Sequence, residues 1–226
     1  MQRYLIDGPT GRLEIAIEEA DARTEGSEGS AAAPRGLAFV AHPHPLFQGT
    51  MDNKVATTLA RTFVQLGYRT ARLNFRGVGD SEGTHDKGIG EQDDMLALIA
   101  HLRAGGQGAD ADTAAAAAAL PIVLAGFSFG AFVASAVAKT LEAREPDLVI
   151  QRLVAVGTPA GNWDVPTVRA DTIAIHGEQD ETIPLANVFE WARPQELPIT
   201  VIPGADHFFH RKLHILKRLV TESWRV

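Results

Sequence analysis

The sequence contains no cysteine. A chain without thiols can form no disulfide, no thiolate metal site and no covalent intermediate on sulfur. Small secreted modules that disulfides hold together are excluded for the same reason.

Long apolar runs and positive charge are also scarce. No stretch approaches the ~18 consecutive apolar residues of a membrane helix, and residues 1–7 lack an apolar segment of signal-peptide length. We therefore expect a cytoplasmic protein with no membrane partner. The chain has 28 Asp and Glu against 21 Lys and Arg, a formal net charge of −7. A nucleic-acid partner would normally leave a basic footprint, so none is expected.

What remains is an ordinary globular composition. With 226 residues, 45% of them hydrophobic and 22% charged, the chain fits a single domain over residues 1–226. Two low-complexity segments, 19–36 and 104–119, are predicted to be surface loops of that domain. The alanine run in the second segment is compatible with a helix or a frayed end.

The apolar residues follow two periods. Alternation from Leu13 to Glu18 predicts a half-exposed strand. Continuous apolar runs are typical of strands buried on both faces of a parallel sheet, and they occur at residues 37–41, 122–125, 153–156 and 173–175. Helical spacing occurs at residues 55–63, 95–102, 132–141 and 213–220. This order predicts an α/β fold: a mainly parallel twisted sheet with an antiparallel N-terminal part and helices on both faces.

The segment around Ser128 has the pattern Gly-x-Ser-x-Gly, directly after a buried strand and directly before an apolar helix. That context is the one a nucleophile elbow requires. Gly126 and Gly130 remove the Cβ atoms that would clash in so tight a turn. The helix start then presents N–H groups to developing negative charge. We therefore interpret Ser128 as a nucleophile.

A serine nucleophile needs a base and an orienting acid, which follow the elbow in the order acid, then histidine. Asp180, in a loop after a buried strand, is the predicted acid by its Gly-x-x-Asp-x-x-x-Pro spacing. His207, in a loop after the next strand, is the predicted base. The rival acids and bases nearby are Glu178, Glu181, Asp206, His210, His214 and His176. We expect Asp206 to fix its own loop and His176 to be a core residue or to support the site indirectly.

The strand at residues 37–41 ends in His42-Pro43-His44-Pro45-Leu46. A loop in this place supplies one oxyanion N–H, and the residue after the nucleophile, Phe129, supplies the other. Proline has no N–H, so the loop donor is His44 or Leu46, less favourably His42. His44 is preferred. Asp52 or Asn53 is expected to cap the next helix.

Two further features have alternative interpretations. His-x-His can chelate a metal, but no cluster at ligand spacing accompanies it, so neither a metal nor another cofactor is expected. The glycine-rich turn at residues 76–83 lacks the lysine and spacing of a phosphate loop. We expect Arg76 and Asp80 to tie loops around the pocket. Glu91 and Asp94 are explained by charge at a helix N-terminus.

Taken together, these motifs resemble a bacterial family of small α/β-hydrolases, related in style to dienelactone hydrolases and compact esterases. The matching segments are residues 42–45, 49–54, 74–79, 126–130 and 204–209. The resemblance spans about residues 1–225 and implies an α/β-hydrolase fold, hydrolase activity and the triad Ser128, Asp180 and His207. Dienelactone hydrolases generally use cysteine, so their reaction is disfavoured here.

The stretch from Val156 to Thr172 is too short to hold a lid domain. We therefore expect an open pocket that suits small or medium acyl esters. Its predicted lining is aromatic and apolar: Leu46, Phe47, Phe127, Trp163 and Phe208.

The predicted function is hydrolysis of such esters through an acyl-enzyme on Ser128, with a small-molecule acyl substrate as partner. Acyl transfer or amide and peptide cleavage by the same triad is the alternative. A third hypothesis is a non-catalytic binding protein built on a hydrolase fold. No residue pattern specifies an oligomeric state, and a homodimer through an edge strand or the C-terminal helix stays open.

Overall fold

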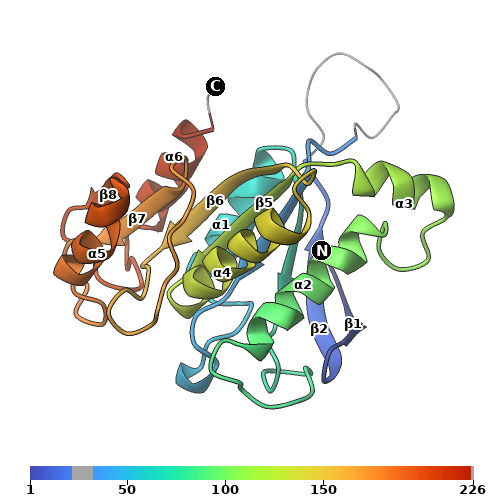
Figure 1. The fold of residues 1–226 in the computed structure, drawn as a ribbon, viewed down its shortest axis with the longest axis horizontal. Coiled ribbons are helices and arrows are strands. Elements are labelled where there is room, and N and C mark those ends of the chain that lie inside the picture. Colours follow the sequence, from blue (N-terminus) through green and yellow to red (C-terminus); the bar gives the residue numbers. More distant parts are fainter. Residues whose placement is uncertain (22–32, 225–226) are drawn as a thin grey trace.

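The structure is a computed structural model that describes residues 1–21 and 33–224. Eight strands form one sheet in the order β1-β2-β4-β3-β5-β6-β7-β8 (Figure 1). β1 and β4 each pair antiparallel with β2, and all other neighbours are parallel. The strands are β1 (Gln2–Gly8), β2 (Gly11–Glu18), β3 (Leu37–Ala41), β4 (Arg69–Leu73), β5 (Ile122–Phe127), β6 (Ile150–Val156), β7 (Ile173–Gly177) and β8 (Ile199–Ile202).

Helices cover both faces of the sheet, as Figure 1 shows with α2 and α4 in front. Successive strand residues point to opposite faces, so Phe39 packs with α2 and α4 while Val40 packs with α1 and α6. The helices are α1 (Lys54–Gln65), α2 (Gly90–Arg103), α3 (Ala111–Ala118), α4 (Phe129–Arg144), α5 (Leu185–Ala192) and α6 (Leu213–Glu222), with 3-10 turns at Pro45–Phe47 and Arg193–Gln195.

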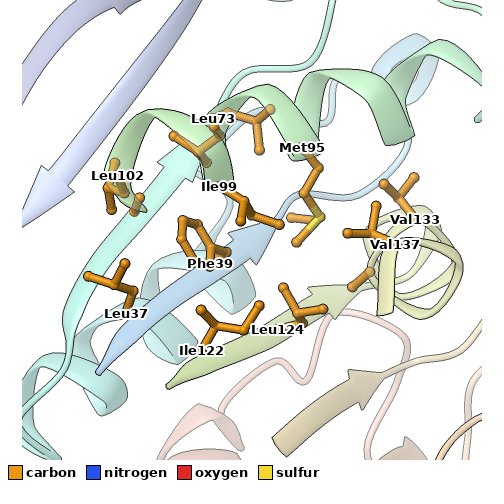
Figure 2. Packing of buried hydrophobic residues seen from close by; sticks show 14 of the residues in the cluster. Leu37, Phe39, Leu73, Met95, Ile99, Leu102, Ile122, Leu124, Val133 and Val137 are labelled. Carbon is orange, nitrogen blue, oxygen red and sulfur yellow. The ribbon is translucent and has the colours of Figure 1, made fainter. Parts of the chain in front are cut away.

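The core beneath α2 and α4 is a dense layer of aliphatic side chains around Phe39 (Figure 2). Met95 and Ile99 of α2, Leu124 of β5 and Val133 of α4 contribute to it and are almost fully buried. Truncating a residue of this kind to alanine typically costs ~2–5 kcal/mol. β5 and α4 both pack on this layer, which supports the turn between them.

The predicted fold class is confirmed, including the antiparallel N-terminal part and the helices on both faces. The predicted loop at 104–119 is partly wrong, because Ala111–Ala118 form α3. Asp110 caps this helix by accepting the Thr113 N–H at 2.8 Å, which holds the alanine run in helical form. Of the predicted loop at 19–36, residues 22–32 lie outside the described part. A single domain over 1–226 stays a prediction.

The N-cap of α1 is Asn53 rather than Asp52. The Asn53 Oδ1 accepts the N–H groups of Val55 (2.9 Å) and Ala56 (3.4 Å). Asp52 instead pairs with Arg3 and Arg72, which tie the start of α1 to the antiparallel strands.

The carboxyl ends of the parallel strands meet at one edge of the sheet, so the loops after β3, β5, β7 and β8 converge there. Between the end of β6 at Val156 and the start of β7 at Ile173 the chain has no helix and no strand longer than an isolated bridge. In the described part of the chain, no lid domain covers the converging loops. Among the described helices, none has both the length and the apolar character needed to cross a membrane.

Candidate active site

The turn from β5 to α4 places Ser128 in a backbone conformation that side chains rarely adopt, with φ +54° and ψ −124°. Such a conformation costs of order 1–3 kcal/mol and persists only where the surroundings impose it. Here the Ser128 N–H donates to the Val156 carbonyl at 2.8 Å. A Cβ at Gly126 would collide with the Gly130 carbonyl, and one at Gly130 with the Ala41 carbonyl. The tight packing explains why both positions are glycine.

Ser128, His207 and Asp180 form one hydrogen-bonded chain. The Ser128 Oγ lies 3.0 Å from His207 Nε2, and His207 Nδ1 lies 2.6 Å from Asp180 Oδ2. All three residues are buried, with 8%, 5% and 5% of their surface exposed. A carboxylate next to Nδ1 requires a proton on that nitrogen, so Nε2 is left to accept from the serine hydroxyl.

Asp180 is held in place by its own loop. Its Oδ1 accepts the N–H groups of Thr182 (2.9 Å) and Ile183 (2.7 Å), which leaves Oδ2 for His207. The arrangement holds the carboxylate against His207.

The rival acids and bases are engaged elsewhere. Asp206 binds His210 through its side chain at 2.6 Å, on the exposed surface. Glu178 accepts the Gly204 N–H at 2.7 Å. Glu181 and His214 are exposed and have no side-chain hydrogen bond within residues 1–21 and 33–224. The local loop role expected for Asp206 agrees with this pairing.

His176 lies behind Asp180, at the end of β7, and is fully buried. Its Nε2 donates to the Ile183 carbonyl at 2.9 Å and is 3.4 Å from Asp180 Oδ2. Burial lowers the pKa of His176 below its ordinary value, so the ring is neutral. It supports the loop that carries the acid and does not reach Ser128.

The two expected oxyanion donors belong to separate segments, the start of α4 and the loop after β3. The Phe129 N–H starts α4, and no acceptor for it occurs in the described residues. In the loop after β3 the Leu46 N–H is already taken by His44 Nδ1 at 3.2 Å. That contact favours the His44 N–H over the Leu46 N–H as the loop donor, and the choice of donor stays a prediction.

Three comparisons with known proteins bear on this geometry. A family model described as X-Pro dipeptidyl-peptidase (S15 family) matches residues 31–158. An α/β serine hydrolase without lid from Xanthomonas campestris is 35% identical with a TM-score of 0.82, covering 99% of this chain and 93% of its own. An α/β serine hydrolase homologue from Coxiella burnetii is 32% identical with a TM-score of 0.78, covering 99% and 97%.

The chain belongs to the α/β-hydrolase superfamily. It is a hydrolase of the serine type, and the resemblance drawn from its motifs is confirmed. A curated relative, the uncharacterized protein RP471 of Rickettsia prowazekii, is 29% identical over 235 residues, covering 98% of this chain and 88% of its own.

In this α/β-hydrolase the loop after β3 is anchored by His42, which is fully buried. The Phe75 N–H donates to His42 Nε2 at 3.1 Å, and His42 Nδ1 donates to the Pro43 carbonyl at 2.6 Å. Burial lowers the pKa of His42 to about 4, so the ring is neutral. His42 therefore holds the loop that presents the His44 N–H.

The ring of Phe129, the residue after Ser128, is buried within an aromatic wall whose other members are partly exposed. We use this name for His44, Phe129, Phe132 and Trp163, whose neighbouring ring centres lie 4.9–6.1 Å apart. His85 adds a ring 4.8 Å from His44. Sequence analysis did not single out His85, because nothing in the chain signals that residues 44 and 85 meet.

The predicted pocket residues divide into two groups. Leu46, Phe47 and Phe208 are exposed by 69%, 81% and 45%, and Trp163 is partly exposed. Phe127 is fully buried, so its assignment to the pocket lining is wrong. Its side chain points into the core beneath the His207 ring, 4.9 Å away, because alternate residues of β5 face opposite sides of the sheet.

Two expectations about the loop after β4 are also corrected. Arg76 does tie this loop, by pairing with Asp94 of α2 through Nε and Nη2 at 2.7–3.2 Å, whereas the Asp80 side chain does not. Asp80 is exposed and binds Glu14 only through its backbone N–H. Glu91 and Asp94 are both fully buried, and Glu91 accepts the N–H groups of Asp86 and Gly88. Both carboxylates therefore hold this loop in place from the interior, and their interpretation as charges at a helix N-terminus is wrong.

Two depressions adjoin the site. One, of about 760 Å³, is lined by His207 and Phe208, by the polar residues Gln179 and Thr182, and by three acidic residues: Asp180, Glu181 and Asp206. The other, of about 660 Å³, begins at Trp163 and Phe132 and follows α4. Within residues 1–21 and 33–224 no group of three or more potential metal ligands is found.

Proposed function

We propose that this hydrolase cleaves small or medium carboxylic esters through an acyl-enzyme on Ser128. The observation that carries the proposal is the hydrogen-bonded chain from Asp180 through His207 to Ser128. Its order matches the roles of orienting acid, general base and nucleophile. His207 Nε2 lies 3.0 Å from the Ser128 Oγ, a distance at which a general base can accept the hydroxyl proton.

In the proposed reaction the Ser128 Oγ attacks the ester carbonyl while His207 Nε2 takes its proton. Asp180 holds the imidazole in the required tautomer and stabilises the imidazolium. The proton then passes from His207 to the leaving alkoxide, which departs as the alcohol. Water, activated by the same histidine, releases the acid and restores Ser128.

The oxyanion is assigned to the N–H groups of Phe129 and His44. The Phe129 donor stands at the N-terminus of α4, where the helix dipole adds to it. Loss of one such donor typically costs ~2.7–4 kcal/mol of transition-state stabilisation. Pro43 and Pro45 flank His44 and restrict its backbone, which supports preorganisation of the hole.

The size of the substrate follows from the open surface. No lid covers the loops, and Leu46, Phe47 and Phe208 project into solvent. Such a site can bury only part of a long acyl chain. We therefore assign short and medium esters rather than emulsified lipids.

The test is hydrolysis of p-nitrophenyl acetate, butyrate, octanoate and palmitate by the wild type and Ser128→Ala. Ser135→Ala is the matched control, because Ser135 lies on the same helix with its hydroxyl bound to the Ala131 carbonyl. We expect activity on the shorter esters that Ser128→Ala abolishes and Ser135→Ala retains. Equal activity in Ser128→Ala would reject Ser128 as nucleophile.

A covalent label gives an independent readout. A fluorophosphonate should add its phosphonyl group to the Ser128 Oγ with loss of fluoride, visible by mass spectrometry of the intact chain. Absence of the adduct in the wild type would favour a non-catalytic binding protein.

The family model favours a second candidate, peptidase activity. The same triad can cleave an amide, with His207 protonating the departing amine. Comparing an X-Pro p-nitroanilide with the esters separates the two. A higher kcat/KM on the anilide would replace the esterase assignment.

A further inference from the structure

The depression of about 660 Å³ is a groove that runs along one side of α4. Four of its lining residues, Phe132, Ala136, Lys139 and Ala143, follow each other at helical spacing of three or four, so they share one face of α4. The other lining residues are Lys87, Gln92, Thr140, Arg144, Trp163, Asp164 and Pro166. We call this feature the α4 groove.

The α4 groove begins at the aromatic wall of the site. The rings of Phe132 and Trp163 lie 5.1 Å apart, and Trp163 is 4.9 Å from Phe129. Phe129 directly follows Ser128 in the chain. The groove therefore starts at rings that pack against the residue next to the nucleophile.

The groove carries an excess of positive charge. Lys87, Lys139 and Arg144 line it, against the single carboxylate of Asp164. None of the three cations has an ion-pair partner within residues 1–21 and 33–224. The whole chain has a net charge of −7, so a surface with three unpaired cations attracts an anion that the rest of the molecule repels.

The mechanism decides which half of the substrate lies here. His207 must reach the leaving group to protonate it, and His207 lines the other, acidic depression. It does not line the α4 groove. The alcohol half therefore belongs on the acidic side, and the acyl half on the side of α4.

We infer that the α4 groove binds an acyl chain that ends in a carboxylate, so that the preferred substrates are monoesters of dicarboxylic acids. This inference rests on the proposed esterase function. The apolar middle of the chain contacts Phe132, Trp163 and Ala136, and the terminal carboxylate meets the lysines. Lys139 is eleven residues beyond Ser128 on α4, about 16 Å along the helix axis at 1.5 Å per residue.

The two lysines differ in their distance from the reaction centre. Lys87 precedes Gly88, whose backbone packs against the Phe132 and Phe129 rings at the start of α4. Lys139 lies about two turns beyond Phe132 on the same helix. A short dicarboxylate should therefore depend more on Lys87, and a longer one more on Lys139.

The experiment compares pairs of p-nitrophenyl esters of equal length: the monoester of adipic acid against hexanoate, and the monoester of sebacic acid against decanoate. The readout is the ratio of kcat/KM for the anionic ester to that for its neutral pair. We expect Lys87→Ala and Lys139→Ala each to lower this ratio by about fivefold, Lys87→Ala mainly with adipate and Lys139→Ala mainly with sebacate. Lys217→Ala is the control and should keep the wild-type ratio, because Lys217 is an exposed residue of α6 that does not line the groove.

Ionic strength gives a second readout. Raising it from ~0.01 to ~0.15 M shortens the Debye length from ~30 to ~8 Å, so the wild-type ratio should fall while the Lys87→Ala, Lys139→Ala double variant responds little. A ratio that is the same in the wild type and the double variant overturns the inference.

Failure of the esterase proposal is recognised separately. If neither member of a pair is hydrolysed, binding of sebacate to the chain and to the double variant is measured by calorimetry. Binding that the double variant loses keeps the groove as a carboxylate site. Equal or absent binding in both rejects it.

Discussion

Asp180 and Asp94 are carboxylates that the fold withdraws from water, and they differ in what they face. Asp180 touches two imidazoles, His207 at 2.6 Å and His176 at 3.4 Å, and is fixed by backbone N–H groups. Asp94 faces the guanidinium of Arg76 at 2.7 Å. It also accepts the Arg76 backbone N–H at 3.0 Å.

The partner decides what each carboxylate can do. Arginine stays protonated at every relevant pH, so the Arg76–Asp94 pair moves no proton and ties the loop after β4 to α2. Burial raises the pKa of Asp94, although Arg76 opposes that rise. Asp180 faces an imidazole that can gain a proton from Ser128. Burial of a carboxylate is therefore no sign of catalysis until its partner is known.

The largest effect is expected at Asp180. Asp180→Asn removes the charge that orients His207 and favours the wrong tautomer, and the corresponding change in a serine protease lowers kcat about 10⁴-fold. We expect a loss of that order in ester hydrolysis, with a melting temperature close to the wild type. A drop below about tenfold would contradict the assigned role of Asp180.

The next effect is on stability. Arg76→Met leaves Asp94 buried without its cation, which typically costs ~3–5 kcal/mol, or roughly 6–20 °C in melting temperature for a chain of this size. Thermal unfolding measures the loss, and ester hydrolysis well below the transition should persist. The double variant Arg76→Met, Asp94→Leu is the control and should regain part of the stability. If Arg76→Met instead abolished kcat while it kept the melting temperature, the contrast between the two carboxylates would fail.

His42 adds a third case to the comparison of Asp180 and Asp94, because it is a buried titratable group that has no charged partner among the described residues and must stay neutral. Its pKa is about 4 in the folded state, against an ordinary value of 6.5. Between pH 6.5 and 4 His42 is protonated in the unfolded chain but neutral in the folded protein. The free energy of unfolding therefore falls as pH falls through this range, by about 3 kcal/mol in total. Urea unfolding at several pH values measures this slope.

His42→Gln supplies the control for that slope. Glutamine has no proton to gain in this range, so the variant is less stable at neutral pH and loses less on acidification. An identical slope in both proteins would assign the acid sensitivity to other groups.

The smallest effect is expected at Asp206, next to His207 in sequence. Its exposed pair with His210 is worth at most ~1 kcal/mol, so Asp206→Asn should change kcat/KM by no more than about fivefold. Steady-state kinetics beside Asp180→Asn provide the comparison. A loss in Asp206→Asn as large as that in Asp180→Asn would shift the orienting role to Asp206.

Short-range sequence patterns were enough to predict the strands, the main helices and the elbow at Ser128. Hydrophobic periodicity and two glycines around a serine are local properties, and the fold class that they predict is confirmed. The positions of Asp180 and His207 followed from loops after neighbouring strands, because parallel strands end at one edge of the sheet. Their catalytic roles stay proposals.

Contacts between distant segments were decided only in three dimensions. The pairing of Arg76 with Asp94, the ring contact of His44 with His85 and the burial of Phe127 depend on how α2, the loop after β3 and β5 pack together. A charged residue in the first turns of a helix looks the same in sequence whether water or an arginine neutralises it. The sequence therefore determined which residues could do chemistry, and tertiary packing decided which partner each one has, because partner choice depends on side chains that lie far apart along the chain.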